Sequence, residues 1–318
     1  METENVLRPT AFDSFIGQQK IVRQLKTHVL AEKLRKERGD ASYLDHMVFE
    51  GNAGLGKTSL AFVIGKELEA KVKVMQGVSI EHQGQLVANI LSLEEGDIFF
   101  IDEIHALSKS LQDALLTIME DFRLDITPPD ADPISITLPR FTLIGATTEI
   151  GTLQTPLKDR FIHKFKLLRY TVDELTEILV RSCNLLLTTY DDEALKFIAG
   201  ASRGTPRIAN NILKKVRNYA DVYNNNHISL SIAKDALNDA SIEESGLEES
   251  DRQYINALLE AKKPLGIKTI SGMLAIDIKT IENDIESFLL FHGLIEKNPK
   301  GRILSEKGMR VAKGELNL

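Results

Sequence analysis

The sequence feature that most restricts the fold is the segment Gly51-Asn-Ala-Gly-Leu-Gly-Lys-Thr58, which fits the pattern G-x-x-x-x-G-K-[ST]. A short apolar run at 47–50 precedes it and a helical pattern at 58–68 follows it. A glycine-rich loop in this position lets backbone N–H groups curve around phosphate oxygens, and the helix N-terminus adds its dipole. A chance glycine-rich turn is the alternative, but the strand–helix context argues against it. We therefore expect Lys57 to reach the β- and γ-phosphates of a nucleotide and the Thr58 hydroxyl to bind Mg²⁺.

The alternation of strand and helix patterns continues through the first ~170 residues, which is the length of one large domain. Further strands are predicted at 72–75, 97–102 and 141–146, and a helix near 110–121. Strands that alternate with helices form parallel sheets joined by crossover connections. The N-terminal part is therefore predicted to be a doubly wound α/β domain.

The remainder of the chain reads as two smaller domains. From 171 to 240 the pattern predicts an all-helical domain with amphipathic helices at 173–187, 191–200, 206–223 and 229–240. The acidic stretch 243–250 suits a linker. Three helical patterns and two short strands then predict a winged helix, with elements at 251–262, 267–275, 278–292, 294–297 and 302–304. We place the domains at 1–169, 170–242 and 243–318.

Composition narrows the function classes. The 318 residues carry 39 Lys and Arg against 46 Asp and Glu, a net charge of −7, which argues against a chain coated in basic charge that grips nucleic acid everywhere. No apolar run approaches the roughly 20 residues that span a bilayer, so no membrane association is expected. The single cysteine, Cys183, lies in an apolar helical stretch and suits a core position in a reducing cytoplasm. We expect a cytoplasmic protein.

An acid pair follows the second long apolar run. Asp102 and Glu103 come directly after Ile98-Phe-Phe-Ile101, so a buried strand delivers two carboxylates to the carboxyl edge of the sheet, beside the phosphate loop. Asp102 is predicted to hold the Mg²⁺ shell. Glu103 is predicted to act as the general base for an attacking water. The alternative is a solvated helix start, since acidic residues often open helices.

Three further polar positions follow in order. Thr147 and Thr148 end a third strand, and a threonine there could sense the γ-phosphate or position water, with β-branched strand filler or a helix cap as the alternative. Arg160 suits an arginine finger that reaches the γ-phosphate of a neighbouring subunit, with a surface ion pair to Asp159 as the alternative. Arg207 follows Thr205 and Pro206, which suit the N-cap and first position of a helix. It reads as a nucleotide sensor or, taken alone, as an exposed arginine.

This order of motifs resembles the AAA+ ATPases, and the likeness is closest to the RuvB family, the bacterial Holliday junction branch-migration motors. It covers nearly the whole chain. The segments that carry it are Leu7-Arg8-Pro9, Ile16-Gly17-Gln18, Gly54-Leu-Gly-Lys-Thr58, Phe100-Ile-Asp-Glu-Ile-His105, Met119-Glu-Asp-Phe-Arg-Leu-Asp125, Phe141-Thr-Leu-Ile-Gly-Ala-Thr-Thr148, Ser202-Arg-Gly-Thr-Pro-Arg-Ile-Ala-Asn210 and Asn298-Pro-Lys-Gly-Arg302.

The resemblance implies a homohexameric ring that moves duplex DNA through its centre using ATP, loaded by RuvA and working beside RuvC. It also implies roles for individual residues. Those around the adenine would be Leu7, Arg8, Ile16 and Tyr170. Those that hold ATP or ADP phosphates and Mg²⁺ would be Gly54, Lys57, Thr58, Ser59 and Asp102. A nucleotide-proximal segment would be Glu120, Asp121 and Phe122. Glu103 would activate water, and the sensors and finger would be Thr148, Arg160 and Arg207.

Some positions depart from the family pattern. Asn52-Ala53 replaces the usual Pro-Pro of the phosphate loop, which should leave ATP binding intact because neither residue blocks the curve of the backbone. Glu149 stands where the family usually has Arg, and Ile162 where it usually has Gly. The segment 127–133 is shorter than the family's hairpin tip, where RuvA docks.

The predicted DNA-binding end is the wing of the third domain. Residues 297–313 carry a net charge of +5, in contrast to the acidic 243–260 stretch. Lys297, Lys300 and Arg302 are predicted to contact phosphates without reading sequence, which suits a motor that works on any DNA. The alternative is a solvated turn whose charges aid solubility.

Two functions fit these predictions. The first is a DNA-translocating ATPase, and the second is a DNA-binding initiator or loader that uses ATP mainly as an assembly switch. The likeness of 125–140 to the family's hairpin and the match of the 204–210 segment favour the first. An ATPase scaffold that acts on proteins lacks support, because neither a substrate domain nor a pore-loop aromatic residue is evident.

Overall fold

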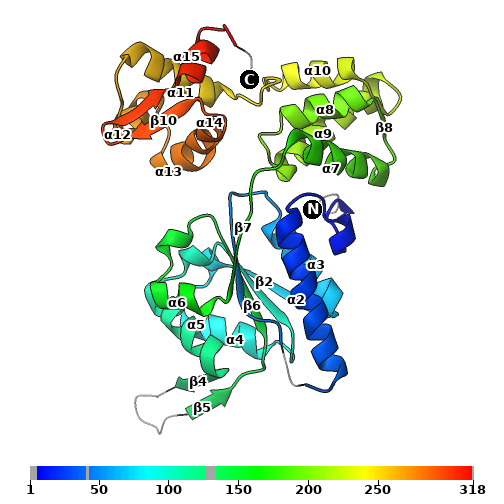
Figure 1. Cartoon of the computed structure of the whole chain (residues 1–318), viewed down its shortest axis with the longest axis vertical. Helices are drawn as coiled ribbons and strands as arrows, with labels where there is room; N and C mark the ends of the chain where they lie inside the picture. The colour runs from blue at the N-terminus through cyan, green and yellow to red at the C-terminus, as the bar shows by residue number, and fades with distance from the viewer. Residues whose placement is uncertain (1–5, 41–42, 127–133, 317–318) are drawn as a thin grey trace. The chain divides into compact units, whose positions relative to one another are not determined.

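The computed structural model describes residues 6–40, 43–126 and 134–316. The chain divides into two compact units, Met1–Tyr170 and Thr171–Leu318 (Figure 1). The segment 127–133, which the sequence analysis compared with a RuvA-docking tip, lies outside the described residues.

The centre of the first unit is a five-stranded sheet in which every pairing is parallel, as predicted. In sheet order the strands are β2 (Val72–Gln76), β3 (Ile98–Asp102), β6 (Thr142–Thr147), β1 (Met47–Glu50) and β7 (His163–Lys166). The three inner strands are buried along nearly their whole length. Such continuous apolar runs are typical of strands with helices on both faces.

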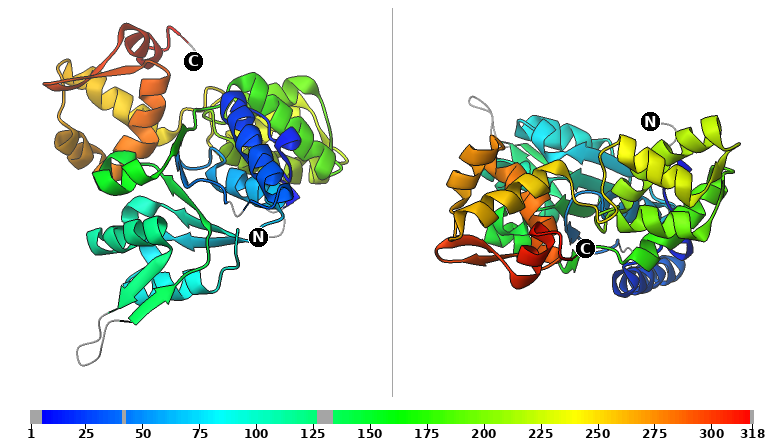
Figure 2. Two further views of the ribbon diagram at one scale, coloured as in Figure 1. Left: turned by 60° about the horizontal axis from the view of Figure 1, so that its bottom comes forward. Right: turned by 90° about the horizontal axis from the view of Figure 1, so that it is seen from above.

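Helices cover both faces of this sheet (Figures 1 and 2). On one face lie α2 (Gln19–Glu37) and α3 (Lys57–Leu68). On the other lie α4 (Gln83–Leu91), α5 (Lys109–Asp121) and α6 (Thr155–Arg160), whose apolar side chains form one core with Val48, Phe99, Ile101 and Leu143. α3 packs closely because it carries Gly65, where a Cβ would lie 2.2 Å from Val72 Cγ2. The sheet is therefore doubly wound.

The sequence patterns predict the strands β1, β2, β3 and β6 and the helices α3 and α5, but not α2, α4, α6 or β7. An antiparallel hairpin, β4 (Arg123–Ile126) with β5 (Ile134–Thr137), follows α5. Short 3₁₀ turns complete the unit: η1 (Phe12–Ser14), η2 (Gly77–Ser79), η3 (Ile104–Ala106) and η4 (Ile150–Thr152). The two turns after β2 and β3 lie at the carboxyl edge of the sheet.

The second unit begins with the four helices of the predicted all-helical domain, which we call the lid: α7 (Val172–Leu185), α8 (Asp192–Gly200), α9 (Pro206–Tyr223) and α10 (Leu230–Asp239). The lid is helical apart from one parallel pair of two-residue strands, β8 (Thr189–Tyr190) and β9 (His227–Ile228), which are too short to leave a pattern in the sequence. Cys183 is fully buried, and burial raises the pKa of its thiol to about 12. The thiol is therefore protonated and unreactive.

The winged helix follows, and its three helices and hairpin are as predicted. Its elements are α11 (Glu249–Ala261), α12 (Ile267–Leu274), α13 (Ile278–Thr280), the π-helical turn η5 (Ile281–Glu286), α14 (Ser287–Phe291), β10 (Ile295–Asn298), β11 (Gly301–Leu304) and α15 (Glu306–Ala312). α13, η5 and α14 run on as the third helix, and β10 pairs antiparallel with β11. The last helix, α15, was not predicted.

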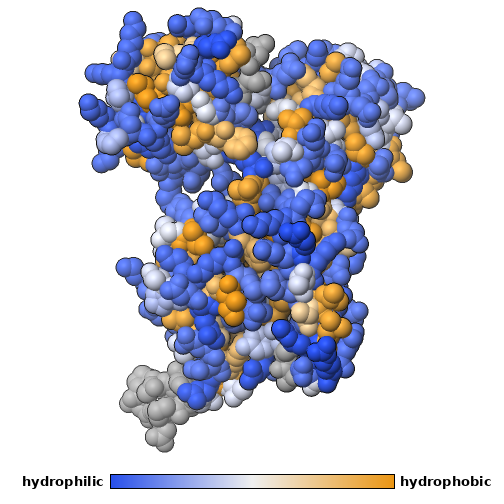
Figure 3. All heavy atoms as spheres, in the orientation of Figure 1, coloured by the Kyte–Doolittle hydropathy of each residue, from blue (hydrophilic) through white to orange (hydrophobic). Residues whose placement is uncertain are grey.

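Hydrophobic side chains on the visible surface form small, separate patches on a mostly hydrophilic face (Figure 3). Within residues 6–40, 43–126 and 134–316, every helix is too short or too polar to cross a membrane.

Candidate active site

The phosphate loop joins β1 to α3, and its conformation requires glycine. Gly51, Gly54 and Gly56 have φ of 151°, 80° and 105°, a region that other residues rarely adopt. At Gly56 a Cβ would also lie 3.1 Å from Phe15 Cζ. Because α3 starts at Lys57, the unpaired N–H groups of its first turn lie at the loop, as an anion site requires.

Lys57 lies inside this loop. Its ammonium donates to the carbonyl oxygens of Gly51 (2.6 Å) and Asn52 (3.1 Å), and the residue is 6% exposed. The Gly51 N–H donates to the Thr147 carbonyl at the end of β6 (3.1 Å), which fixes the start of the loop to the sheet. Lys57 is therefore a largely desolvated cation at a helix N-terminus.

The acid pair lies at the same edge of the sheet. Asp102 ends β3, and its carboxylate accepts from the Glu103 N–H (3.1 Å) and from the Gln76 side-chain amide at the end of β2 (3.4 Å). Carboxylate and hydroxyl oxygens are the ligands that Mg²⁺ prefers. Asp102 and Thr58 therefore fit a magnesium ion by their chemistry.

Glu103 is held by the end of the neighbouring strand. Its Oε2 accepts from the Thr148 N–H and the Thr148 hydroxyl, both at 3.3 Å, and lies 3.1 Å from Nδ1 of His105. Glu103 itself has φ of 49°. The structure thus brings together two predicted site residues that are 45 positions apart in the sequence, and it adds His105, which the sequence analysis did not select.

Of the four residues predicted to surround the adenine, Tyr170 contacts the phosphate loop and Arg8 contacts the helix that follows it. Tyr170 donates its hydroxyl to the Leu55 carbonyl (3.1 Å), and Arg8 lies over the ring of Phe62, 5.4 Å from its centroid. Leu7 is buried and Ile16 is half-buried. Phe15 and Phe62 were missed because a single aromatic residue near a helix carries no distinctive sequence signal.

Arg160 lies elsewhere in the first unit. Its guanidinium donates to the Met119 carbonyl at the end of α5 (2.9 Å), and its Nε is buried with no hydrogen-bond partner among the described residues. The alternative ion pair with Asp159 does not form, because Asp159 pairs with Lys164. The hydrogen bonds of Arg160 therefore connect it to α5 and not to the phosphate loop.

A buried histidine shares the carbonyl that Arg160 contacts. His46 Nε2 lies 3.4 Å from the Met119 oxygen, and His46 Nδ1 accepts from the Leu143 N–H (2.9 Å). Burial lowers the pKa of His46 to about 4, so the ring is neutral at pH 7. Nearby, Phe122 packs edge-on against Tyr43, while Glu120 and Asp121 are exposed at the end of α5. The predicted segment 120–122 thus shares the Arg160 region.

In the second unit, Arg207 is exposed in the first turn of α9, after the predicted N-cap Thr205 and Pro206. Its neighbour Arg203 is buried and was missed by the sequence analysis. Arg203 contacts the Asp251 carboxylate through both terminal nitrogens and donates to the carbonyls of Gly246 (2.9 Å) and Asp284 (3.0 Å).

The predicted DNA-binding cations of the wing are not equivalent. Arg302 Nε donates to Glu286 (2.8 Å), and Lys297 Nζ forms an ion pair with the same carboxylate (2.6 Å). Glu286 is fully buried, and although burial alone would raise its pKa, the bonds from Arg302 and Lys297 hold that pKa below its ordinary value. Arg302 also contacts Glu282 (3.2 Å). Lys300 is exposed.

This pairing corrects the charge count of the wing. The +5 counted along residues 297–313 leaves out Glu282 and Glu286, which come from the third helix and neutralise Arg302 and Lys297 in space. Lys297 is exposed but paired with Glu286. The exposed positive charge outside these ion pairs is carried by Lys300 and by Lys307, Arg310 and Lys313 on and beside α15.

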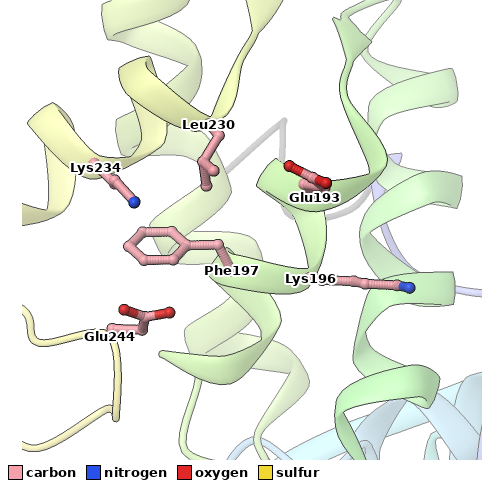
Figure 4. Close-up of a pocket in the computed structure, with 6 residues that line it drawn as sticks. All are labelled: Glu193, Lys196, Phe197, Leu230, Lys234 and Glu244. Atoms are coloured by element: carbon pink, nitrogen blue, oxygen red, sulfur yellow. The ribbon is translucent and has the colours of Figure 1, made fainter.

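A separate pocket lies on the lid (Figure 4). The ring of Phe197 lies between the Lys234 ammonium and the Glu244 carboxylate, whereas Lys196 points away. The lining residues are Glu193, Lys196, Phe197, Leu230, Lys234 and Glu244. None of them is a predicted site residue.

Taken together, the doubly wound sheet with its phosphate loop after β1, the acid pair after β3, the threonine after β6 and the helical lid are the architecture of an AAA+ ATPase. Three family models then match the chain in order: the Holliday junction DNA helicase RuvB P-loop domain at 7–167, the RuvB AAA lid domain at 170–243 and the RuvB C-terminal winged helix domain at 244–313. The chain belongs to the RuvB family.

Individual relatives agree with this assignment. The chain is 44% identical, over 98% of its length and 90% of the relative's, to the Holliday junction branch migration complex subunit RuvB of Campylobacter fetus subsp. fetus. It is 45% identical, over 98% and 92%, to the protein of the same name from Nitratiruptor sp.. The solved structure of the Thermotoga maritima RuvB Holliday junction branch migration motor superposes with a TM-score of 0.86 at 37% identity, covering 98% of this chain and all of that one (100%).

Proposed function

We propose that this protein is an ATP-driven DNA motor that promotes branch migration of Holliday junctions in recombination and DNA repair, by moving duplex DNA through a ring of identical subunits. The main support is that Lys57, Asp102, Glu103 and Thr148 lie at one edge of one sheet, around a loop whose conformation suits phosphate binding. The printed names of the relatives support branch migration as the use of that site.

The residues of this site divide the work of ATP hydrolysis. Gly54, Lys57, Thr58 and Ser59 hold the phosphates of ATP or ADP. Glu103 takes a proton from water as that water attacks the γ-phosphorus. Thr148 contacts the γ-phosphate. Thr58 and Asp102 would hold Mg²⁺, which neutralises charge on the β- and γ-phosphate oxygens when bound.

We assign the remaining roles by the family likeness. Leu7, Arg8, Ile16 and Tyr170 hold the adenine, and Arg207 is a sensor on the lid. Arg160 acts in trans on the nucleotide of the neighbouring subunit of a homohexamer, with the segment 120–122 beside it.

The wider proposal concerns domains and partners. We place the ATPase domain at 1–169, the lid at 170–242 and the winged-helix head at 243–318, with the wing as the contact to duplex DNA. RuvA would load the ring and RuvC would resolve the junction. A protein that works on chromosomal DNA would act in the cytoplasm, where the buried thiol of Cys183 would stay reduced.

An assay on a synthetic four-way junction tests the function. The full-length chain with its RuvA partner should dissociate the junction into duplexes when ATP and Mg²⁺ are present, and Lys57→Ala should abolish both ATP hydrolysis and dissociation. Tight ATP-dependent binding to duplex DNA without junction movement would instead support the initiator or loader.

A further inference from the structure

The two oxygens of the Glu103 carboxylate have different surroundings. Oε2 accepts hydrogen bonds from the Thr148 N–H and the Thr148 hydroxyl, and it lies 3.1 Å from Nδ1 of His105. Oε1 has no hydrogen-bond partner among the residues that the structure describes. One oxygen is therefore anchored while the other is open to accept a proton.

The carboxylate also determines which nitrogen of His105 carries a proton. A carboxylate oxygen accepts hydrogen bonds, so we assign the ring hydrogen to Nδ1, the nitrogen 3.1 Å from Oε2. The same Nδ1 lies 3.0 Å from the Thr147 hydroxyl oxygen, which accepts from the Glu149 N–H (2.9 Å). The ring is thus held between the end of β6 and the turn after β3, and its side chain is 19% exposed.

His105 and Thr148 differ in what else they must do. Both bonds from Thr148 to Glu103 are 3.3 Å, and the Thr148 hydroxyl has a second proposed task at the γ-phosphate. When that hydroxyl turns to phosphate, its bond to Glu103 is lost. The His105 ring is instead fixed by the Thr147 hydroxyl (3.0 Å), so its 3.1 Å contact with Oε2 persists when the Thr148 hydroxyl turns away.

We propose that His105 is a positioning residue that keeps the Glu103 carboxylate aimed at the attacking water; this rests on the proposed ATP hydrolysis. In that step the water oxygen bonds to the γ-phosphorus and the bond to the bridging oxygen of ADP breaks. ADP keeps the electron pair, and the water proton passes to Oε1 of Glu103. A carboxylate that swings away from this direction loses rate although nucleotide still binds.

Two substitutions in the full-length chain test this role. His105→Leu removes the donor and should lower kcat for ATP about 10- to 100-fold, the loss expected when a reacting group is misplaced by about 1 Å, with KM unchanged. His105→Asn places an amide N–H at the position of Nδ1 and should restore most of the rate. His28→Leu is the matched control, because His28 stacks on His163 and not on the active site.

The outcomes separate the two proposals. An unchanged kcat for His105→Leu, or an equal loss in His105→Leu and His105→Asn, would overturn the positioning role while leaving ATP hydrolysis intact. A rise in KM with kcat unchanged would also overturn it, because it would assign His105 to nucleotide binding. A wild-type chain that hydrolyses no ATP would overturn the proposed function and this inference with it.

Discussion

The phosphate site and the second unit both contain cations with little exposure to solvent, but these cations have different partners. Lys57 donates to main-chain carbonyls of its own loop, and Glu103 accepts from neutral groups. In the second unit Arg203 and Arg302 are instead matched to the buried carboxylates Asp251 and Glu286. A cation that faces carbonyl oxygens keeps its charge available to an incoming phosphate, whereas a cation that faces a buried carboxylate is already neutralised.

The partner of each cation indicates whether that cation stabilises the fold. Arg203 binds Asp251, lies 3.9 Å from the centroid of the Phe288 ring and donates to two main-chain carbonyls. It leads directly into the lid turn that carries Arg207, while its partners belong to the segment that follows the lid and to the winged helix. Arg203 therefore fastens the lid to the winged helix, and Arg207, four residues on, stays exposed.

The largest effect is expected for Arg160→Ala, which removes a positive charge proposed to act on the nucleotide phosphates. An arginine finger contributes about 10³–10⁵ to the rate of phosphoryl transfer, so kcat for ATP should fall by at least ~10³ while nucleotide binding persists. Equilibrium binding of a fluorescent ATP analogue and steady-state hydrolysis measure the two effects.

Mixed rings decide whether that arginine acts in trans. Arg160→Ala and Glu103→Gln are each inactive alone, but a mixture contains interfaces where an intact Glu103 faces an intact Arg160. Hydrolysis should reappear on mixing. Mixtures that stay as inactive as either variant would contradict the trans role and return Arg160 to its own subunit.

The next largest effect is a loss of stability, expected when Arg203, the partner of a buried carboxylate, is removed. Arg203→Ala leaves the buried Asp251 carboxylate without its cation and should destabilise the second unit by about 3–5 kcal/mol. Urea unfolding of the full chain measures this. Arg207→Ala, an exposed neighbour, should change the free energy of unfolding by no more than about 0.5 kcal/mol.

The double variant Arg203→Met with Asp251→Leu removes both charges and should recover most of the lost stability. If stability is not recovered, the burial of an unpaired charge is not the cause of the loss.

Arg302→Ala should have a smaller effect on the same scale. Glu286 would keep Lys297 and the Tyr254 hydroxyl (2.8 Å) as partners, so a loss of about 2–3 kcal/mol is expected. Thermal and urea unfolding should agree. A variant that is as stable as the wild type but binds duplex DNA less tightly would show that Arg302 serves DNA and not the fold.

These cases also show what the sequence could predict. The phosphate loop and the acid pair follow from local spacing, because a strand, a glycine-rich turn and a helix fix their geometry within a few residues of each other. His105 lies only two positions from Glu103, but it was not selected because the contact that fixes its ring, with Thr147, spans 42 positions. In the wing, a distant residue removes a predicted site instead of adding one. Glu286 lies 16 positions before Arg302, and the packing of the hairpin against the third helix brings the two together.

The smallest effect is expected at the tip of the wing, where an exposed lysine lies two residues from a paired arginine. Lys300 lies two residues from Arg302, is exposed and forms no ion pair among the described residues, so Lys300→Ala should leave stability within about 0.5 kcal/mol of the wild type. Loss of one phosphate contact per bound wing should reduce the slope of log K against log salt concentration by ~0.9. Fluorescence anisotropy of labelled duplex DNA across a salt series measures that slope. A slope that is unchanged in Lys300→Ala would remove the wing tip from the DNA contact and shift the assignment to the exposed cations of α15.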